Sequence, residues 1–211
     1  MDKGLTLERV KITKGDETLL EVSHQILPGS VLTVMGPSGV GKSTLLSYVT
    51  GTLAPDFRAS GRVLLDGVDI TDAAPHQRRV GILFQDDLLF PHMSVGANLA
   101  FGLAKGGTRS ERHEKVEAAL AEVGLAGFSD RDPATLSGGQ KARVALMRML
   151  LSEPCALLLD EPFSRLDAAL RAQVREMVFA RARARELPVL MVTHDADDAV
   201  AAGGEVIKLG E

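Results

Sequence analysis

One glycine-rich segment has the residue types and the spacing to hold phosphate groups. Residues 36–43 read Gly-Pro-Ser-Gly-Val-Gly-Lys-Ser. Glycines let several backbone N–H groups point inward as an anion nest, and a following helix adds its positive N-terminal end. Lys42 can reach β- and γ-phosphates, and the Ser43 hydroxyl can ligate Mg²⁺. The segment predicts nucleotide binding, the alternative being a turn that binds nothing; the residues assigned to this site are Gly36, Pro37, Ser38, Gly39, Val40, Gly41, Lys42, Ser43 and Thr44.

A pair of acids at the end of an apolar run forms a second candidate site. Residues 155–161 read Cys-Ala-Leu-Leu-Leu-Asp-Glu. Asp160 is placed to hold Mg²⁺, and Glu161 to orient or deprotonate an attacking water. Because successive side chains of a strand point to opposite faces, the two acids should do different jobs. The alternative is that these are two solvated acids at the end of a strand. The phosphate loop upstream makes this the weaker interpretation.

A second glycine signature lies at residues 136–140, which read Leu-Ser-Gly-Gly-Gln. Ser137 can cap a helix, while Gly138 and Gly139 leave backbone amides open at its positive end, with Gln140 completing the capping pattern. The chain would then have two phosphate-binding helix ends, although one nucleotide has a single γ-phosphate. A head-to-tail dimer resolves this, because each chain's signature would close the partner's phosphate loop.

The segments that must position these residues alternate strands with helices, which predicts an α/β fold with a mostly parallel sheet covered on both faces. A hairpin at Asp66-Gly67 predicts an antiparallel β edge, and capped helices predict an inserted helical subdomain at about 87–153. Strands are expected at 5–12, 31–35, 62–65, 68–70, 80–84, 155–159, 189–192 and 206–209. Helices are expected from 44, at 94–103, from 108 to about 123, from 137 to 150, from 167 to about 185 and at 195–202.

Composition narrows the class of protein. The 211 residues have a formal net charge of −4, and 45% are hydrophobic, which excludes a disordered chain. The mild acidity argues against nucleic acid as a partner. A single cysteine, Cys155, suits a reducing compartment. No apolar run approaches the roughly 20 residues of a membrane helix, so we expect a cytosolic chain or one held at a membrane by another protein.

Together, the motifs resemble those of the ATP-binding subunit of ABC transporters, and the resemblance covers essentially the whole chain in the correct order. Residues 84–102 are similar to ATPases of bacterial importers for thiamine, polyamines, ferric iron and oxyanions. The matching motifs are the phosphate loop at 36–43, the glutamine loop at Gln85, the signature at 136–140, the acidic strand end at 157–160 with Glu161, the D-loop at 164–167 and the switch histidine His194.

This resemblance implies a phosphate-loop NTPase with ATP and Mg²⁺ as cofactors. It implies that Ser43, Gln85 and Asp160 hold the metal, and that Glu161, His194 and Gln85 are catalytic. It further implies an ATP-bound homodimer on transmembrane permease subunits, at the cytoplasmic face of the inner membrane, with an extracytoplasmic solute-binding protein as an indirect partner. The apolar residues of 86–95 would then form a groove for a short permease helix, and Gln85 could report the nucleotide state to that groove.

The sequence departs from the family pattern at two places. Where an aromatic residue usually stacks on adenine, residues 13–15 read Thr-Lys-Gly, with Lys14 at the matching position. Adenine should therefore lie on an aliphatic or cationic surface, or a loop aromatic should reach it. Arg165 stands in the D-loop, where it would cross the dimer interface or extend into solvent. We also expect one ATPase domain, 1–211, with no C-terminal regulatory domain.

Two other functions fit parts of this sequence. A soluble mechanical ATPase acting on DNA, ribosomes or a protein complex usually has coiled-coil insertions or tandem copies, and neither is seen here. A nucleotide sensor without turnover would lack the catalytic acid, but Glu161 is present.

Overall fold

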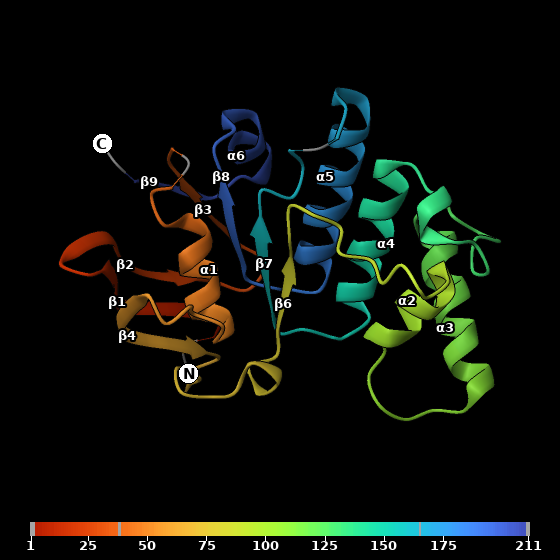
Figure 1. The fold of residues 1–211 in the computed structure, drawn as a ribbon, viewed down its shortest axis with the longest axis horizontal. Helices are drawn as coiled ribbons and strands as arrows, with labels where there is room; N and C mark the ends of the chain where they lie inside the picture. The colour runs from red at the N-terminus through yellow and green to blue at the C-terminus, as the bar shows by residue number, and fades with distance from the viewer. Residues whose placement is uncertain (1–2, 38, 165, 210–211) are drawn as a thin grey trace.

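The computed structural model describes residues 3–37, 39–164 and 166–209. Two positions singled out above, Ser38 and Arg165, lie outside the described residues. Over the described part of the chain, strands and helices form two sheets and the helices that cover them (Figure 1).

A five-stranded parallel sheet forms the centre of the described structure, in the order β6-β7-β8-β3-β9. Its strands are short and mostly buried, as expected for a sheet covered on both faces. They are β3 (Val31–Met35), β6 (Val80–Leu83), β7 (Ala156–Asp160), β8 (Val189–Thr193) and β9 (Glu205–Lys208).

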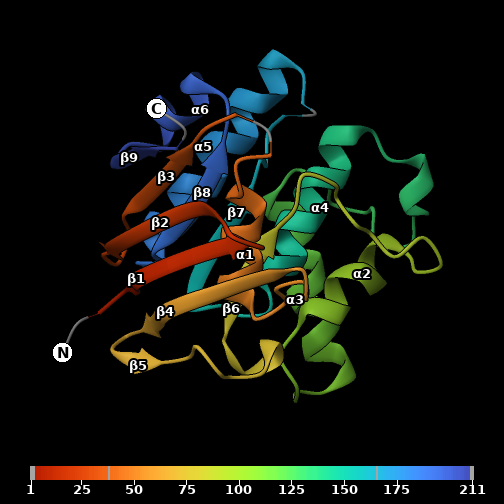
Figure 2. The same cartoon turned by 60° about the vertical axis from the view of Figure 1, so that its left-hand side comes forward.

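An antiparallel sheet in the order β2-β1-β4-β5 lies beside it within the described residues. Its strands are β1 (Leu5–Lys14), β2 (Glu17–Ile26), β4 (Phe57–Leu65) and β5 (Val68–Asp69). Figure 2 shows α1 (Lys42–Thr50) between the two sheets, where its apolar residues join the core that both sheets share. This packing fixes the start of α1, and with it the phosphate loop.

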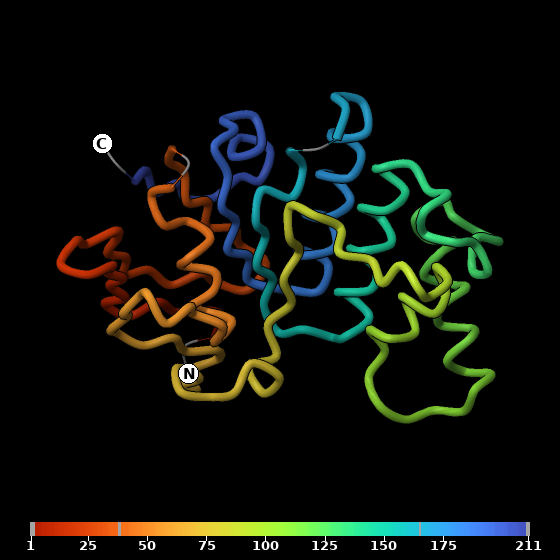
Figure 3. Tube along the Cα trace, viewed as in Figure 1, coloured from red at the N-terminus to blue at the C-terminus, as the bar shows by residue number. Residues whose placement is uncertain are grey.

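Helices also cover the other face of the parallel sheet. In β7, Ala156 and Leu158 face the α1 core, whereas Leu157 and Leu159 face a second core that contains residues of α4 and α5. In Figure 3 the segment with α2, α3 and α4 lies at one end of the molecule and the antiparallel strands at the other. The helices are α2 (Val95–Gly102), α3 (Arg109–Glu122), α4 (Gly138–Leu150), α5 (Ala168–Ala184) and α6 (Ala196–Ala202).

The structure confirms the predicted fold class, the parallel sheet and its antiparallel β edge. Both predicted capping boxes are present, at Thr108 with Glu111 and at Ser137 with Gln140. The prediction missed β2, and it placed the start of β4 five residues too late. Among the described residues, no helix has both the length and the apolar composition that crossing a membrane requires.

Candidate functional site

The phosphate loop connects the end of β3 to the start of α1. Gly41 is the N-cap residue of α1 and has φ of 98°, a left-handed conformation that glycine adopts without strain. A Cβ at this position would also lie 3.3 Å from Leu19 Cβ and Leu20 Cδ2. Because only a glycine fits here, the backbone can turn its N–H groups toward the helix axis and present them to an anion.

Lys42 is buried under the loop, with 5% of its surface exposed. Its Nζ donates to the carbonyl oxygens of Gly36, at 2.7 Å, and Pro37, at 2.9 Å. These bonds use two of the three donors of the ammonium group and fix it beneath the anion nest.

Ser43 and Asp160 meet at the adjacent end of β7. The Ser43 hydroxyl donates to Asp160 Oδ1 at 2.9 Å. Asp160 faces α1 because strand alternation puts it on the same side as Ala156 and Leu158. Burial raises the pKa of Asp160 above its ordinary value, the Ser43 bond opposes this, and the Glu161 charge adds to it.

Glu161 has left the strand and faces His194. Its φ is 45°, and its N–H donates to the Val192 carbonyl at 3.0 Å. His194 Nδ1 lies 3.1 Å from Glu161 Oε1. The prediction that the two acids take opposite faces was wrong in its geometry, because β7 ends at Asp160 and both acids line one cleft. Their contacts still differ, since Asp160 binds Ser43 and Glu161 faces the histidine.

The cleft lined by Lys42, Ser43, Asp160 and Glu161 has a volume of about 480 Å³, which lies in the range of small-molecule sites, and His194 is not among its lining residues. Within it, the hydroxyl of Ser43, the carboxylate of Asp160 and the amide of Gln85 supply the oxygen ligands that Mg²⁺ prefers. The described residues contain no cluster of three or more His, Cys, Asp or Glu that could hold a metal by itself. The donor set therefore fits an ion that also takes phosphate oxygens and water. The lining residues are Lys14, Leu19, Gly39, Gly41, Lys42, Ser43, Thr44, Phe57, Gln85, Asp160 and Glu161.

Phe57 is the aromatic residue among the described residues that line this cleft. It starts β4 and pairs in register with Lys14, whose Nζ lies 5.6 Å from the centre of the ring. Leu19 lines the same region. The sequence left three kinds of surface open for adenine, namely aliphatic, cationic and aromatic. The cleft contains at least one side chain of each kind. Sequence reasoning missed Phe57 because only the β1–β4 register places it beside Lys14.

The signature segment lies at the start of α4, outside the phosphate cleft. Ser137 accepts a hydrogen bond from the Gln140 N–H at 3.4 Å, and Gln140 Oε1 accepts one from the Ser137 N–H at 2.9 Å. Ser137 and Gly138 are exposed, whereas Gly139 is buried against Leu170 of α5. None of the four signature residues 137–140 lines the phosphate cleft.

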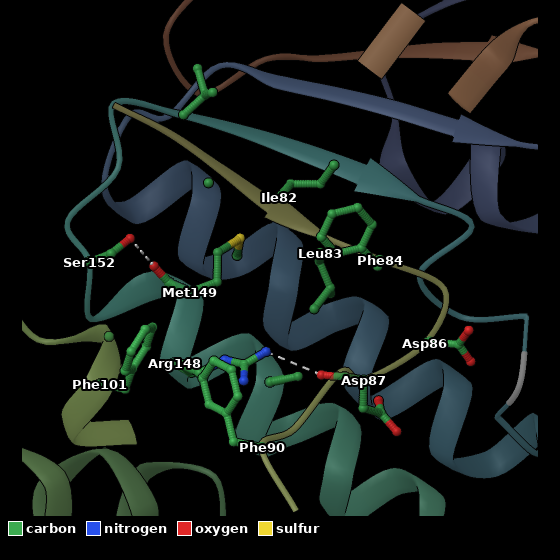
Figure 4. Close-up of a pocket in the computed structure, with 14 residues that line it drawn as sticks. Ile82, Leu83, Phe84, Asp86, Asp87, Phe90, Phe101, Arg148, Met149 and Ser152 are labelled. Atoms are coloured by element: carbon green, nitrogen blue, oxygen red, sulfur yellow. Dashed lines mark hydrogen bonds between the residues drawn. The ribbon is translucent and has the colours of Figure 1, made fainter. Parts of the chain in front are cut away.

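A second cavity, of about 350 Å³, lies beside the first, between β6, α2 and α4 (Figure 4). Arg148 connects two walls of this cavity: it donates to the carbonyl oxygens of Asp87 and Leu88 and lies over the ring of Phe90. Phe84 and Asp86 line this cavity, whereas Gln85 between them lines the phosphate cleft. The glutamine loop therefore borders both cavities.

Comparisons with known proteins agree with this geometry. The family model described as "ABC transporter" matches residues 19–164. The uncharacterised ABC transporter ATP-binding protein YnjD of Escherichia coli is 47% identical over 208 residues, which are 98% of this chain and 95% of that protein. The Fe(3+) ions import ATP-binding protein FbpC of Agrobacterium fabrum is 43% identical, over 99% of this chain and 59% of that protein.

Among solved structures, cbiO1 from Clostridium perfringens is described as part of the ABC transporter complex cbiONQ. It matches with a TM-score of 0.85 and 30% sequence identity, over 99% of this chain and 85% of that chain. The likeness thus covers the fold as well as the motifs.

The cleft predicts that Phe57 contributes to nucleotide affinity through the base. Phe57→Ala should weaken ATP binding roughly tenfold, because the stacking surface is lost, and leave binding of inorganic tripolyphosphate unchanged. Calorimetric titration measures both affinities. Phe128→Ala is a matched control, since it also removes a ring beside a cation, Arg131, at 3.6 Å. The role of Phe57 would be contradicted if the affinities for ATP and tripolyphosphate fell equally, or if the affinity for ATP did not fall.

Proposed function

The chain belongs to the ABC transporter family and is one of its ATP-binding ATPases, and from this premise we propose that it powers solute import through a membrane permease. The observation that supports this most directly is the likeness to an ion-import ATPase over 99% of this chain. The separation of the signature turn at 137–140 from the phosphate cleft supports the pairing of two copies, because each site then needs a second copy of the chain. Likeness to an ion-import ATPase supports the direction of transport.

Nucleotide binding is the first step that the chain's own groups perform. The backbone N–H groups of residues 39–44, which include the N-terminus of α1, hold the phosphates, and Lys42 contributes the positive charge. Ser43, Asp160 and Gln85 hold Mg²⁺, which neutralises charge on the phosphate oxygens when bound. Phe57, with Lys14 and Leu19 around it, receives the base.

Hydrolysis depends on the pair formed by Glu161 and His194. The Glu161 carboxylate orients a water molecule for attack on the γ-phosphate and accepts its proton. His194, 56% exposed at its side chain, holds that carboxylate through Nδ1, and in its protonated form it can also donate from Nε2 to the γ-phosphate.

The reaction is completed by a second copy of this chain. In a head-to-tail homodimer, Ser137, Gly138 and Gly139 of one copy lie on the γ-phosphate bound by the other, and Gln140 holds the cap that positions them. Hydrolysis removes the bridging phosphate and reopens the dimer.

The second cavity is the docking site for the permease. Phe84 and Phe101 line it and are 43% and 66% exposed, which is unusual for large apolar side chains gathered in one place. A short amphipathic helix of the permease fits such a groove. This contact places the chain at the cytoplasmic face of the inner membrane, where an extracytoplasmic solute-binding protein supplies the permease with its cargo.

We predict that Glu161→Gln slows ATP hydrolysis by about a hundredfold, because an amide cannot accept the proton, while ATP binding is retained. A steady-state phosphate-release assay and a titration measure the two quantities. Glu153→Gln, a change at an exposed residue that does not line the cleft, serves as the control. Near-normal hydrolysis in the Glu161→Gln variant would remove this residue from the role of base.

We predict that Ser137→Arg abolishes ATP-dependent dimers without weakening ATP binding, because the signature turn acts only on the partner's nucleotide. Light scattering in a Glu161→Gln background, where the dimer should persist, measures this. Ser94→Arg is the matched control, because Ser94 caps α2 in the same way as Ser137 caps α4. A dimer of undiminished stability would argue against the two-site arrangement.

We predict that Phe101→Asp prevents co-purification of a multi-spanning membrane protein with the chain, while ATP hydrolysis by the isolated chain is unchanged. Burying an unpaired carboxylate in an apolar interface is unfavourable. Val68→Asp, at a side chain 63% exposed on β5, is the control. If the Phe101→Asp variant still brings down that protein from membranes, the groove is not the docking site.

A further inference from the structure

A cluster of ion pairs outside the cleft ties the segment that carries His194 to α5. Asp198 in α6 is almost fully buried, with 2% of its side chain exposed. Arg171 donates to it in a bidentate manner, from Nε at 3.1 Å and from Nη2 at 2.9 Å, and Arg175 donates from Nη1 at 3.1 Å. A buried carboxylate held by two guanidinium groups fixes α6 against α5.

Arg171 also reaches the residue that follows His194. Its Nη2 lies 2.8 Å from Asp195 Oδ2. The other oxygen, Oδ1, caps α6 by accepting from the N–H groups of Asp197 and Asp198, at 2.8 and 3.3 Å. One carboxylate therefore joins the start of α6 to α5, directly beside the histidine.

The side chain of His194 is 56% exposed, and its ion-pair partner among the described residues is Glu161. Its neighbours are fixed instead: Thr193 is buried in β8, and its hydroxyl accepts from the Asp195 N–H at 3.0 Å. The direction of His194 is therefore set by the backbone on each side, and on the Asp195 side by Arg171.

From these contacts we propose that Arg171 is a positioning residue for His194, an inference that rests on the role proposed for that histidine. Its guanidinium holds Asp195 and Asp198 together, so that the segment between β8 and α6 keeps the imidazole against Glu161. The planar fork of arginine suits this task, whereas the ammonium of lysine is a single point charge.

Two substitutions break the contact to Asp195 in different ways. Arg171→Ala removes the guanidinium. Asp195→Asn keeps an Oδ1 that caps α6, but replaces the acceptor that faces Arg171 with an N–H donor, so it tests the contact even if the first variant is unstable. Arg175→Ala is the matched control, because in the described structure Arg175 donates to Asp198, whereas the ion pair with Asp195 is formed by Arg171.

The first measurement is the NMR signal of the His194 imidazole, identified by its absence in a His194→Ala sample. We expect the signal to move toward that of free histidine in the Arg171→Ala and Asp195→Asn variants, and to stay in place in the Arg175→Ala variant. This readout needs no hydrolysis, so it is independent of the proposed function. An unmoved signal in both test variants would overturn the inference.

The second measurement is hydrolysis at varied ATP concentration. We expect Arg171→Ala to lower kcat roughly tenfold with KM unchanged, and the Arg171→Ala/His194→Ala double variant to be no slower than His194→Ala alone, because the two residues act through one group. Additive losses, or a change in KM alone, would contradict the inference. A His194→Ala variant as active as the unmodified chain would instead contradict the role proposed for the histidine.

Discussion

The N-termini of α1 and α4 cannot both bind the same phosphate, because the parallel sheet separates them. The N-termini of α1 and α4 each present backbone N–H groups, and a helix end acts on an anion only over its first turn. Yet α1 packs in the core on one face of the parallel sheet, and α4 packs in the core on the other. The functions proposed for the other features follow from this constraint: the exposed signature turn would act on a phosphate held by a second copy, and the signature of that copy would close the cleft.

The sequence allowed the fold to be predicted wherever the pattern is local. The buried strands of the parallel sheet are continuous apolar runs, and the capped helices begin at serine, threonine or aspartate side chains that accept N–H donors in the structure. The strand β2 could not be found in this way, because Leu19 and Leu20 are adjacent and interrupt the alternation. Its pairing with β1 identifies it, and pairing is a long-range property that periodicity does not contain.

The site residues likewise fall into those with a local sequence signal and those placed by long-range packing. The phosphate loop, Asp160, Glu161 and His194 are recognisable because each lies at the end of a strand or directly after one, and parallel strands bring their carboxyl ends to one edge of the sheet. Phe57 and Arg171 lack such a signal. Phe57 enters the cleft through its register with Lys14, and Arg171 reaches Asp195 because α5 and α6 pack together. Glu161 shows the limit of strand alternation, since the strand ends one residue before it.

The first turn of α5 connects the two halves of the machinery within one chain. Leu170 occupies the space beside Gly139, so closely that a Cβ there would lie 1.8 Å from its Cδ2. The next residue, Arg171, bonds through its backbone N–H to Asp167 at 2.8 Å and through its side chain to Asp195. The same turn therefore touches the signature, which we propose acts on the partner's nucleotide, and the histidine segment, which we propose acts on the chain's own. Close-packed side chains cannot move independently of one another. A displacement of this turn therefore also displaces the signature and the histidine segment.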